Sequence, residues 1–166
     1  RGGGIDVCLA AQKVGPTGKA IGVDMTPAML ERARKNAEKA GLTNVEFRFG
    51  HAQSLPVEDT SVDVIISNCV INLTEDKGQV FREAYRVLRS GGRLEISDVV
   101  TDQAFPAGMR AKPENWGSCI FGALPEQEYL DLIAQAGFKN VNVKHSPNAG
   151  EVEGVKIYSA LVQGYK

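Results

Sequence analysis

Helical and strand patterns alternate along almost the whole chain, and this alternation most constrains the fold. The stretch from Val62 to Val70 is a nearly continuous run of β-branched residues, typical of a strand buried on both faces of a parallel sheet. Apolar residues at helical spacing precede and follow it, with glycine or proline at the boundaries. We expect helices over 5–14, 28–40, 75–88 and 125–136, and strands over 19–24, 44–49, 62–70, 93–100, 140–145 and 155–165.

This order of elements predicts an α/β fold with a single, doubly wound, Rossmann-like sheet. A short connection, Ser146–Gly154, joins the last two strands in place of a helix, which indicates an antiparallel hairpin at the C-terminal edge. The irregular segment 101–124 is typical of a lid on the substrate side of a site. We therefore expect one domain over residues 1–166.

Composition excludes several classes of function. Of 166 residues, 19 are basic and 20 acidic, so a net charge of −1 supplies no field that would attract nucleic acid or an anionic membrane. The sequence contains no apolar stretch approaching the roughly 18 residues of a membrane span. The cysteine count is three, and no secretory signal is recognisable. These features predict reduced thiols and a cytoplasmic location.

A glycine run before a helix, followed by a strand that ends in an acid, indicates nucleotide-like ligand binding. Gly2, Gly3 and Gly4 would let backbone N–H groups approach a ligand, and Asp24 would accept hydrogen bonds from a ribose diol. A plain tight turn and a helix-capping acid would give the same pattern. Met25 could lie on an adenine face or simply pack in the core.

A second strand ends at Gly50 and is followed by polar residues. His51 and Gln53 are candidates for contact with an adenine edge, although both would also suit a solvated loop. His145 lies in an alternating edge strand, which indicates a structural role.

Two cysteines occupy positions that could face a ligand. Cys69 follows the buried strand at its carboxyl end, where ligands of open α/β sheets bind. A cysteine in an apolar run can also be an inert small hydrophobe. Cys119 lies in the irregular segment, between glycines and close to Trp116, the only tryptophan.

The order of these motifs resembles that of the arsenite methyltransferases, a branch of the class I S-adenosylmethionine-dependent methyltransferases. The segments SNCVINL and WGSCIFGAL carry the most specific part of the resemblance. It implies that Cys69 and Cys119 hold trivalent arsenic as thiolates, with S-adenosylmethionine as the cofactor. It also implies the residues that bind this cofactor: Gly2, Gly4, Asp24, Met25, His51, Ala52 and Asn68.

Trivalent arsenic prefers about three sulfur ligands, so two cysteines would need a third thiol. We expect arsenite or an arsenic–thiol conjugate as substrate, a thiol reductant of the glutathione or thioredoxin type as partner, and no other metal. The family has its first, central strand before the glycine loop, so we also expect the N-terminus to lack that strand. Cys8 matches none of the family's upstream cysteines and is expected to face the core.

Two alternatives to arsenic methylation remain open at the level of sequence. One is a class I methyltransferase that acts on a small organic molecule, with Cys69 and Cys119 as passive lining. The other is a non-catalytic module that binds the cofactor or arsenic without turnover.

Overall fold

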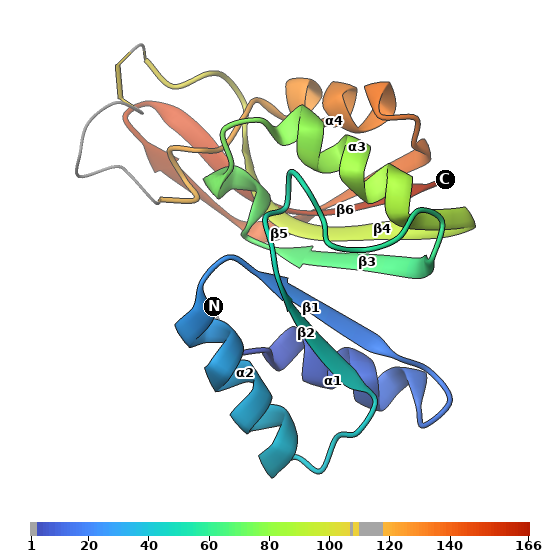
Figure 1. Cartoon of the computed structure of the whole chain (residues 1–166). Coiled ribbons are helices and arrows are strands. Elements are labelled where there is room, and N and C mark those ends of the chain that lie inside the picture. Colours follow the sequence, from blue (N-terminus) through green and yellow to red (C-terminus); the bar gives the residue numbers. More distant parts are fainter. Residues whose placement is uncertain (1–2, 107, 110–117) are drawn as a thin grey trace. The chain divides into compact units, whose positions relative to one another are not determined.

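The computed structural model describes residues 3–106, 108–109 and 118–166. The chain divides into two compact units, Arg1–Pro56 and Val57–Lys166, which are described separately below (Figure 1).

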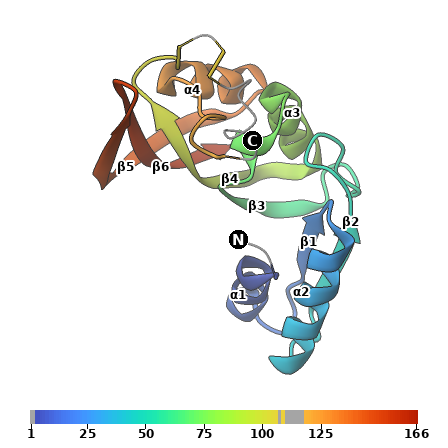
Figure 2. The same ribbon diagram turned by 90° about the vertical axis from the view of Figure 1, so that its left-hand side faces the viewer.

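The first unit combines two helices with a two-stranded parallel sheet. Its elements are α1 (Ile5–Val14), β1 (Ala20–Asp24), α2 (Pro27–Lys39) and β2 (Val45–Phe49). The register places Asp24 opposite Phe49, so the carboxyl ends of both strands lie at one edge of the sheet. Both helices contact both strands. Figure 2 shows these elements in a second view.

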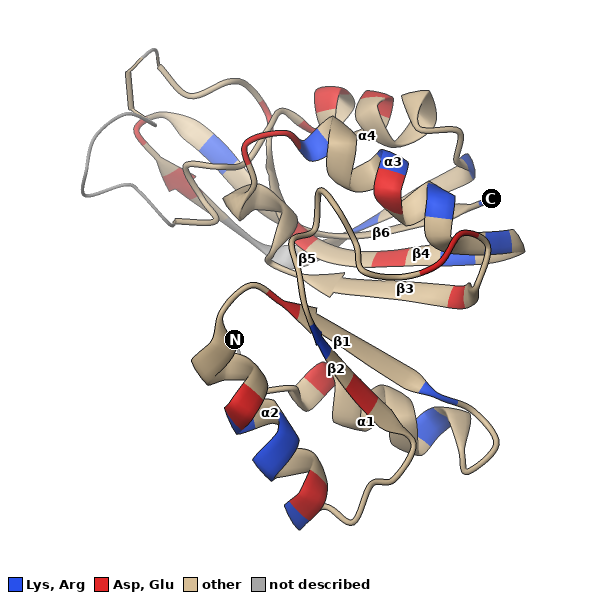
Figure 3. Cartoon of the chain, viewed as in Figure 1, with Lys and Arg blue, Asp and Glu red and all other residues tan. Residues whose placement is uncertain are grey.

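Helix α2 follows the amphipathic pattern that its sequence predicts. Leu30, Ala33 and Ala37 are its buried residues, at the spacing of one helical face. The rest of the helix carries acidic and basic side chains in close succession (Figure 3), including an ion pair of 2.9 Å between Glu31 and Lys35. The helix thus faces the unit with small apolar residues and presents charges of both signs outward.

The second unit is built on a mixed four-stranded sheet with the strand order β3-β4-β6-β5. Its elements are β3 (Val62–Asn68), the 3-10 helix η1 (Ile71–Leu73), α3 (Lys77–Val87), β4 (Leu88–Thr101), α4 (Glu126–Gln135), β5 (Lys139–Val152) and β6 (Val155–Tyr165). Strand β3 is parallel to β4, while β6 is antiparallel to both β4 and β5. Helices α3 and α4 pack against each other on one face of this sheet (Figure 1).

The core of the second unit lies between these two helices and the sheet. Phe81 of α3 and Tyr129 of α4 are fully buried, and their rings meet edge to face with centroids 5.4 Å apart. Leu94 and Ile96 lie beneath them on β4, where buried and less buried residues alternate. The helix spacing and the strand alternation therefore converge on one apolar layer.

The α/β class and the antiparallel C-terminal edge are confirmed, but the prediction of a single sheet is wrong for the described residues. Strand β1 pairs with β2, and β3 pairs with β4. No strand in the described part of the chain bonds to both β1 and β3, so the strands form two sheets.

The bounds of two elements also differ from the sequence prediction. Strand β4 begins at Leu88, directly after α3, because Leu88 is buried opposite Val62 and the following glycines form a bulged extension of the strand. Strands β5 and β6 are joined by Glu153 and Gly154 alone. Both residues have positive φ angles, 53° and 76°, as a tight two-residue hairpin turn requires.

Candidate functional site

The glycine loop before α1 packs closely against α2, which leaves no room for side chains at Gly4. Gly4 is the N-cap of α1, with a φ angle of 74°. A Cβ atom added there would lie 2.8 Å from the Cβ atom of Ala33, too close for any side chain. The Asn36 side chain donates a hydrogen bond of 2.8 Å to the Gly3 carbonyl. The backbone itself therefore forms this wall of the site, while Gly2 lies outside the described residues.

Asp24 ends β1 with its carboxylate at the edge of the sheet. One carboxylate oxygen accepts a hydrogen bond of 2.8 Å from the Thr26 N–H, so Asp24 helps to begin α2. The Gly50 N–H donates to the Asp24 carbonyl over 3.2 Å, which ties the end of β1 to the loop after β2. Asp24 and the His51 segment thus reach the same edge of this sheet.

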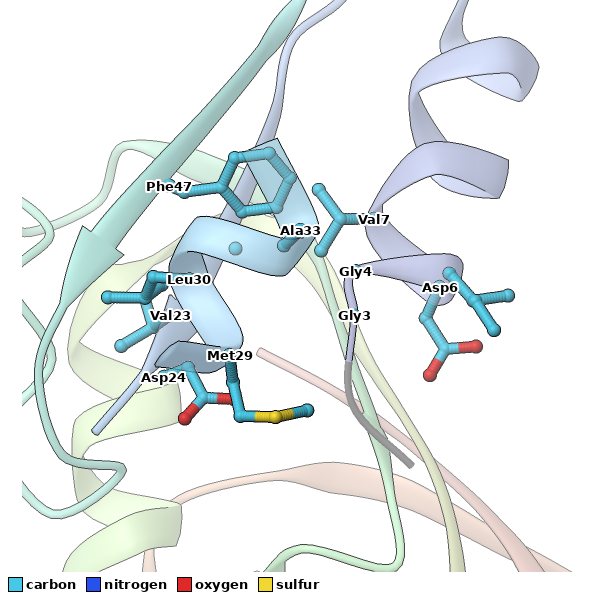
Figure 4. Close-up of a pocket in the computed structure, with 12 residues that line it drawn as sticks. Gly3, Gly4, Asp6, Val7, Val23, Asp24, Met29, Leu30, Ala33 and Phe47 are labelled. Carbon is cyan, nitrogen blue, oxygen red and sulfur yellow. The ribbon is translucent and has the colours of Figure 1, made fainter. Parts of the chain in front are cut away.

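A cavity of about 110 Å³ opens beside the glycine loop and Asp24. Figure 4 shows the side chains of Asp24 and Met29 among its lining residues, together with Gly3 and Gly4. Met29 lies in the first turn of α2 and was not among the predicted residues. An apolar residue in the first turn of the helix, two positions after Pro27, was the sequence signal for it, because side chains on a helix point back toward its N-terminus and here toward the strand end.

Three other predicted cofactor residues of the first unit, among those that the structure describes, lie outside the lining of this cavity. Met25 is 62% exposed. His51 is exposed and packs edge to face against Phe49, with ring centroids 6.0 Å apart. Ala52 is half-buried in the following turn. Contact of these three residues with a cofactor remains a prediction.

The second unit positions Cys69 at the carboxyl end of β3, next to Asn68. The Cys69 N–H donates a hydrogen bond of 2.8 Å to the Ser97 carbonyl, which continues the pairing of β3 with β4. The backbone then turns sharply, because Cys69 has a φ angle of 54°. This left-handed conformation costs a non-glycine residue about 1–3 kcal/mol and persists only where the surroundings enforce it.

Cys119 lies beside Cys69 although 50 residues separate them in the chain. Its sulfur donates a hydrogen bond of 3.1 Å to the Cys69 carbonyl. A compact turn holds Cys119 in place, with the Gly122 N–H donating to the Ser118 carbonyl over 3.2 Å. The predicted lid is described only in part, and Trp116 lies outside the described residues. Cys8, in α1 of the first unit, is half-buried.

A buried polar cluster beneath the two cysteines was not predicted from the sequence. Its members are at most 4% exposed and come from η1, α3, β4 and α4: Asn72, Lys77, Asp98 and Tyr129. The Asn72 side chain donates to Asp98 Oδ1 over 2.8 Å, and the Tyr129 hydroxyl donates to Asp98 Oδ2 over 3.4 Å. An acid at an inward position of an otherwise apolar strand was the signal that could have revealed this cluster.

Burial dominates the electrostatics of this cluster. It raises the pKa of the Asp98 carboxyl, while hydrogen bonds from the Val99 and Asn72 N–H groups and the charge of Lys77 lower the pKa and offset part of that effect. Burial also raises the pKa of Tyr129, and the charges of Asp98 and Cys69 raise it further. Tyr129 therefore remains a neutral hydrogen-bond donor.

The raised pKa of Asp98 predicts how stability depends on pH. The native state holds this proton more tightly than the unfolded chain, so the contribution of Asp98 to stability falls as pH rises from the unfolded pKa through the higher native pKa. We expect the free energy of unfolding of Asp98→Asn, relative to wild type, to increase over that range by at most about 1.4 kcal/mol per pH unit.

Urea unfolding at a series of pH values measures this difference. Thr101→Val, which alters a fully buried hydroxyl on the same strand, is the control and should follow the wild-type pH dependence. Parallel curves for wild type and Asp98→Asn would contradict the prediction.

Within the described ranges, no group of three or more His, Cys, Asp or Glu side chains could hold a metal ion. No helix in the part of the chain that the structure describes is long and apolar enough to cross a membrane. A glycine-walled cavity with an acid at a strand end, on a Rossmann-like α/β fold, is typical of sites for nucleotide-like ligands, as the resemblance to the class I methyltransferases predicts.

Comparison with known proteins agrees with this class. A family model described as a methyltransferase domain matches residues 2–137. The chain therefore belongs to the family of class I S-adenosylmethionine-dependent methyltransferase domains. Its structure also superimposes on an arsenic(III) S-adenosylmethionine methyltransferase from Chlamydomonas reinhardtii, with a TM-score of 0.88 and 35% identity, over 99% of this chain and 61% of that one.

Two sequence relatives differ in how much of their own length is matched. The arsenite methyltransferase of Halobacterium salinarum is 49% identical over 142 residues, which are 86% of this chain and 36% of the relative. A demethylmenaquinone methyltransferase of Listeria monocytogenes is 36% identical over 174 residues, with 87% of this chain and 73% of the relative covered. The chain thus spans little more than a third of the arsenite methyltransferase from Halobacterium.

Proposed function

We propose that this chain binds S-adenosylmethionine and trivalent arsenic and transfers a methyl group to the arsenic. The observation that carries the arsenic part is the hydrogen bond of 3.1 Å from the Cys119 sulfur to the Cys69 carbonyl, which brings two thiol-bearing segments together. The similarity to arsenite methyltransferases supports the same assignment.

Residues of the first unit would hold the cofactor. A cofactor contact of Asn68, at the end of β3, stays a prediction from the sequence. Gly3 and Gly4 leave the backbone open, and the Asp24 carboxylate at the strand end has the chemistry to accept hydrogen bonds from a ribose diol. Gly2, Met25, His51 and Ala52 would complete the contacts. S-adenosylmethionine, when bound, supplies an electrophilic methyl group on a positively charged sulfur.

The cysteine pair would hold the substrate. Thiolates of Cys69 and Cys119 displace hydroxide ligands of arsenite, and a small-molecule thiol supplies the third sulfur. Sulfur coordination suits this soft centre and leaves its lone pair free to act as the nucleophile. No general base is needed at the transfer step, so these residues act by positioning, which can contribute roughly 7–11 kcal/mol to lowering a barrier.

We place the protein in the cytoplasm, where a thiol reductant of the glutathione or thioredoxin type would be its partner.

Arsenite binding to wild type and to single cysteine variants tests this proposal. Each cysteine multiplies the affinity provided by the other, because the second bond forms within one complex. We therefore expect Cys69→Ser and Cys119→Ser each to weaken binding by about 100-fold or more. Calorimetric titration with arsenite, without added thiols, measures the effect.

Cys8→Ser is the matched control. Cys8 lies in the first unit and the cysteine pair in the second, so this variant should bind arsenite with wild-type affinity. Equal affinity in all four proteins would overturn the arsenic assignment and leave methyl transfer standing.

The second candidate is methyl transfer to a small organic molecule. The similarity to the demethylmenaquinone methyltransferase of Listeria favours this function. The match covers 73% of that relative, whereas the match to the arsenite methyltransferase of Halobacterium covers 36% of that protein. This function predicts S-adenosylmethionine binding together with arsenite affinity that does not depend on Cys69 or Cys119. The same titrations, repeated with S-adenosylmethionine, separate the two functions from a module that binds arsenic alone.

A further inference from the structure

Asn72 ties the segment that carries Cys69 to strand β4. This residue follows Cys69 by three positions and is 2% exposed. Its side-chain amide donates to Asp98 Oδ1 over 2.8 Å and to the Val99 carbonyl over 2.7 Å. Its backbone N–H donates to Asp98 Oδ2 over 3.3 Å. The loop after β3 is therefore attached to β4 through both the side chain and the backbone of one residue.

The same residue forms the surface on which the Cys119 turn rests. A Cβ atom added to Gly122 would lie 1.9 Å from the Asn72 carbonyl oxygen, so the two backbones are in direct contact. Gly122 closes the turn that contains Cys119 by donating to the Ser118 carbonyl. Any displacement of Asn72 would thus move the Cys119 turn as well as the Cys69 loop.

This arrangement is retained despite local costs. Cys69 has a left-handed backbone conformation, and the Asn72 side-chain oxygen is buried without a hydrogen-bond partner in the described structure. Asp98 is a buried carboxyl group whose pKa burial raises. Costs of this kind persist where a geometry is needed that the most stable packing would not provide.

We propose that Asn72, held by Asp98, is a positioning residue that sets the separation of the Cys69 and Cys119 sulfurs. The need for a fixed sulfur separation rests on the proposed arsenic-binding function. The placement of Asn72 rests on the hydrogen bonds and the backbone contact described above. Asn72 acts through the two cysteines and does not itself touch the substrate.

Cross-linking of the two thiols measures their separation without arsenic. In a Cys8→Ser background, a short reagent that becomes fluorescent only when both of its arms have reacted with thiols reports the pair. We expect Asn72→Ala and Asp98→Asn to slow cross-linking by about tenfold or more, because small misplacements strongly reduce reactions that require two aligned groups. Alkylation by a reagent with a single arm should keep its wild-type rate.

Thr101→Val is the control for a change of one buried polar group on the same strand, and it should cross-link like wild type. Wild-type cross-linking in a folded Asn72→Ala variant, or equal slowing in Thr101→Val, would overturn the proposal. If Asn72→Ala does not unfold cooperatively, the cross-linking rate of the nearly isosteric variant Asp98→Asn tests the proposal in its place.

Arsenite titration of the same proteins distinguishes the two hypotheses. Slower cross-linking in Asn72→Ala and Asp98→Asn, together with no arsenite binding by the wild-type protein, would contradict the proposed function and support the positioning role. Arsenite binding that needs both cysteines, combined with unchanged cross-linking in both variants, would contradict the positioning role alone.

Discussion

Replacement of Gly122 by alanine should separate the two cysteine segments. The new Cβ atom would lie 1.9 Å from the Asn72 carbonyl oxygen, and this neighbour is backbone rather than the end of a flexible side chain. Overpacking of this kind costs roughly 1–3 kcal/mol, and relief requires the Cys119 turn to move away from η1. We expect a lower free energy of unfolding and arsenite binding weakened about tenfold or more.

Gly164→Ala provides the matched control within the same unit. A Cβ atom at Gly164 would meet Phe138 at 3.4 Å, an ordinary contact distance, on strand β6. This variant should bind arsenite like wild type. Urea unfolding and arsenite titration of the two variants give the comparison, and equal arsenite affinity in both would show that the contact between Gly122 and Asn72 does not position Cys119.

Gly4→Ala is expected to damage the cofactor wall of the first unit. Two costs combine at this position, because its φ angle of 74° disfavours any side chain and the new Cβ atom would lie 2.8 Å from that of Ala33. The left-handed conformation costs about 1–2 kcal/mol and the steric overlap roughly 1–3 kcal/mol. We expect a loss of about 2–5 kcal/mol in stability and weaker binding of S-adenosylmethionine, measured by unfolding and calorimetric titration.

Gly41→Ala separates these two costs. Gly41 ends α2 in a left-handed conformation with a φ angle of 66°, and nothing lies within 4 Å of an added Cβ atom. This variant should show the conformational cost alone and leave cofactor affinity unchanged. Similar stability losses in Gly4→Ala and Gly41→Ala would mean that the close approach of the glycine loop to α2 has no effect on stability.

Local periodicity was sufficient to predict most elements of this fold. The helix predicted over 5–14 and the strands predicted near Asp24 and Phe49 agree closely with α1, β1 and β2. These elements depend on apolar spacing and on turn residues, both of which are visible within a short window. The bounds of β4 and of the terminal hairpin were missed because pairing with a neighbouring strand, rather than local preference, extends them.

For the site, too, residues marked by local sequence motifs were predicted, and residues whose role depends on distant partners were not. Cys69 and Cys119 were selected from their sequence contexts, and the structure joins their segments through the hydrogen bond from Cys119 to the Cys69 carbonyl. Asn72 and Asp98 were not selected, because a single polar residue in an apolar segment does not reveal its partner. Met29, which lines the cavity beside Asp24, was not selected either, because its place there depends on side-chain direction on α2. The cofactor contact of Met25 stays a prediction.

The amino-acid sequence by itself determined the α/β class, the order of helices and strands, the glycine loop with its strand-end acid and the two cysteine segments. These features follow from side-chain periodicity and from motifs whose residues are close together in the chain. Only the tertiary structure decided the division into two sheets, the contact of Cys119 with Cys69 and the buried cluster around Asp98. Hydrogen bonds and close backbone contacts between distant residues set these features, and no local pattern encodes which distant partner will be met.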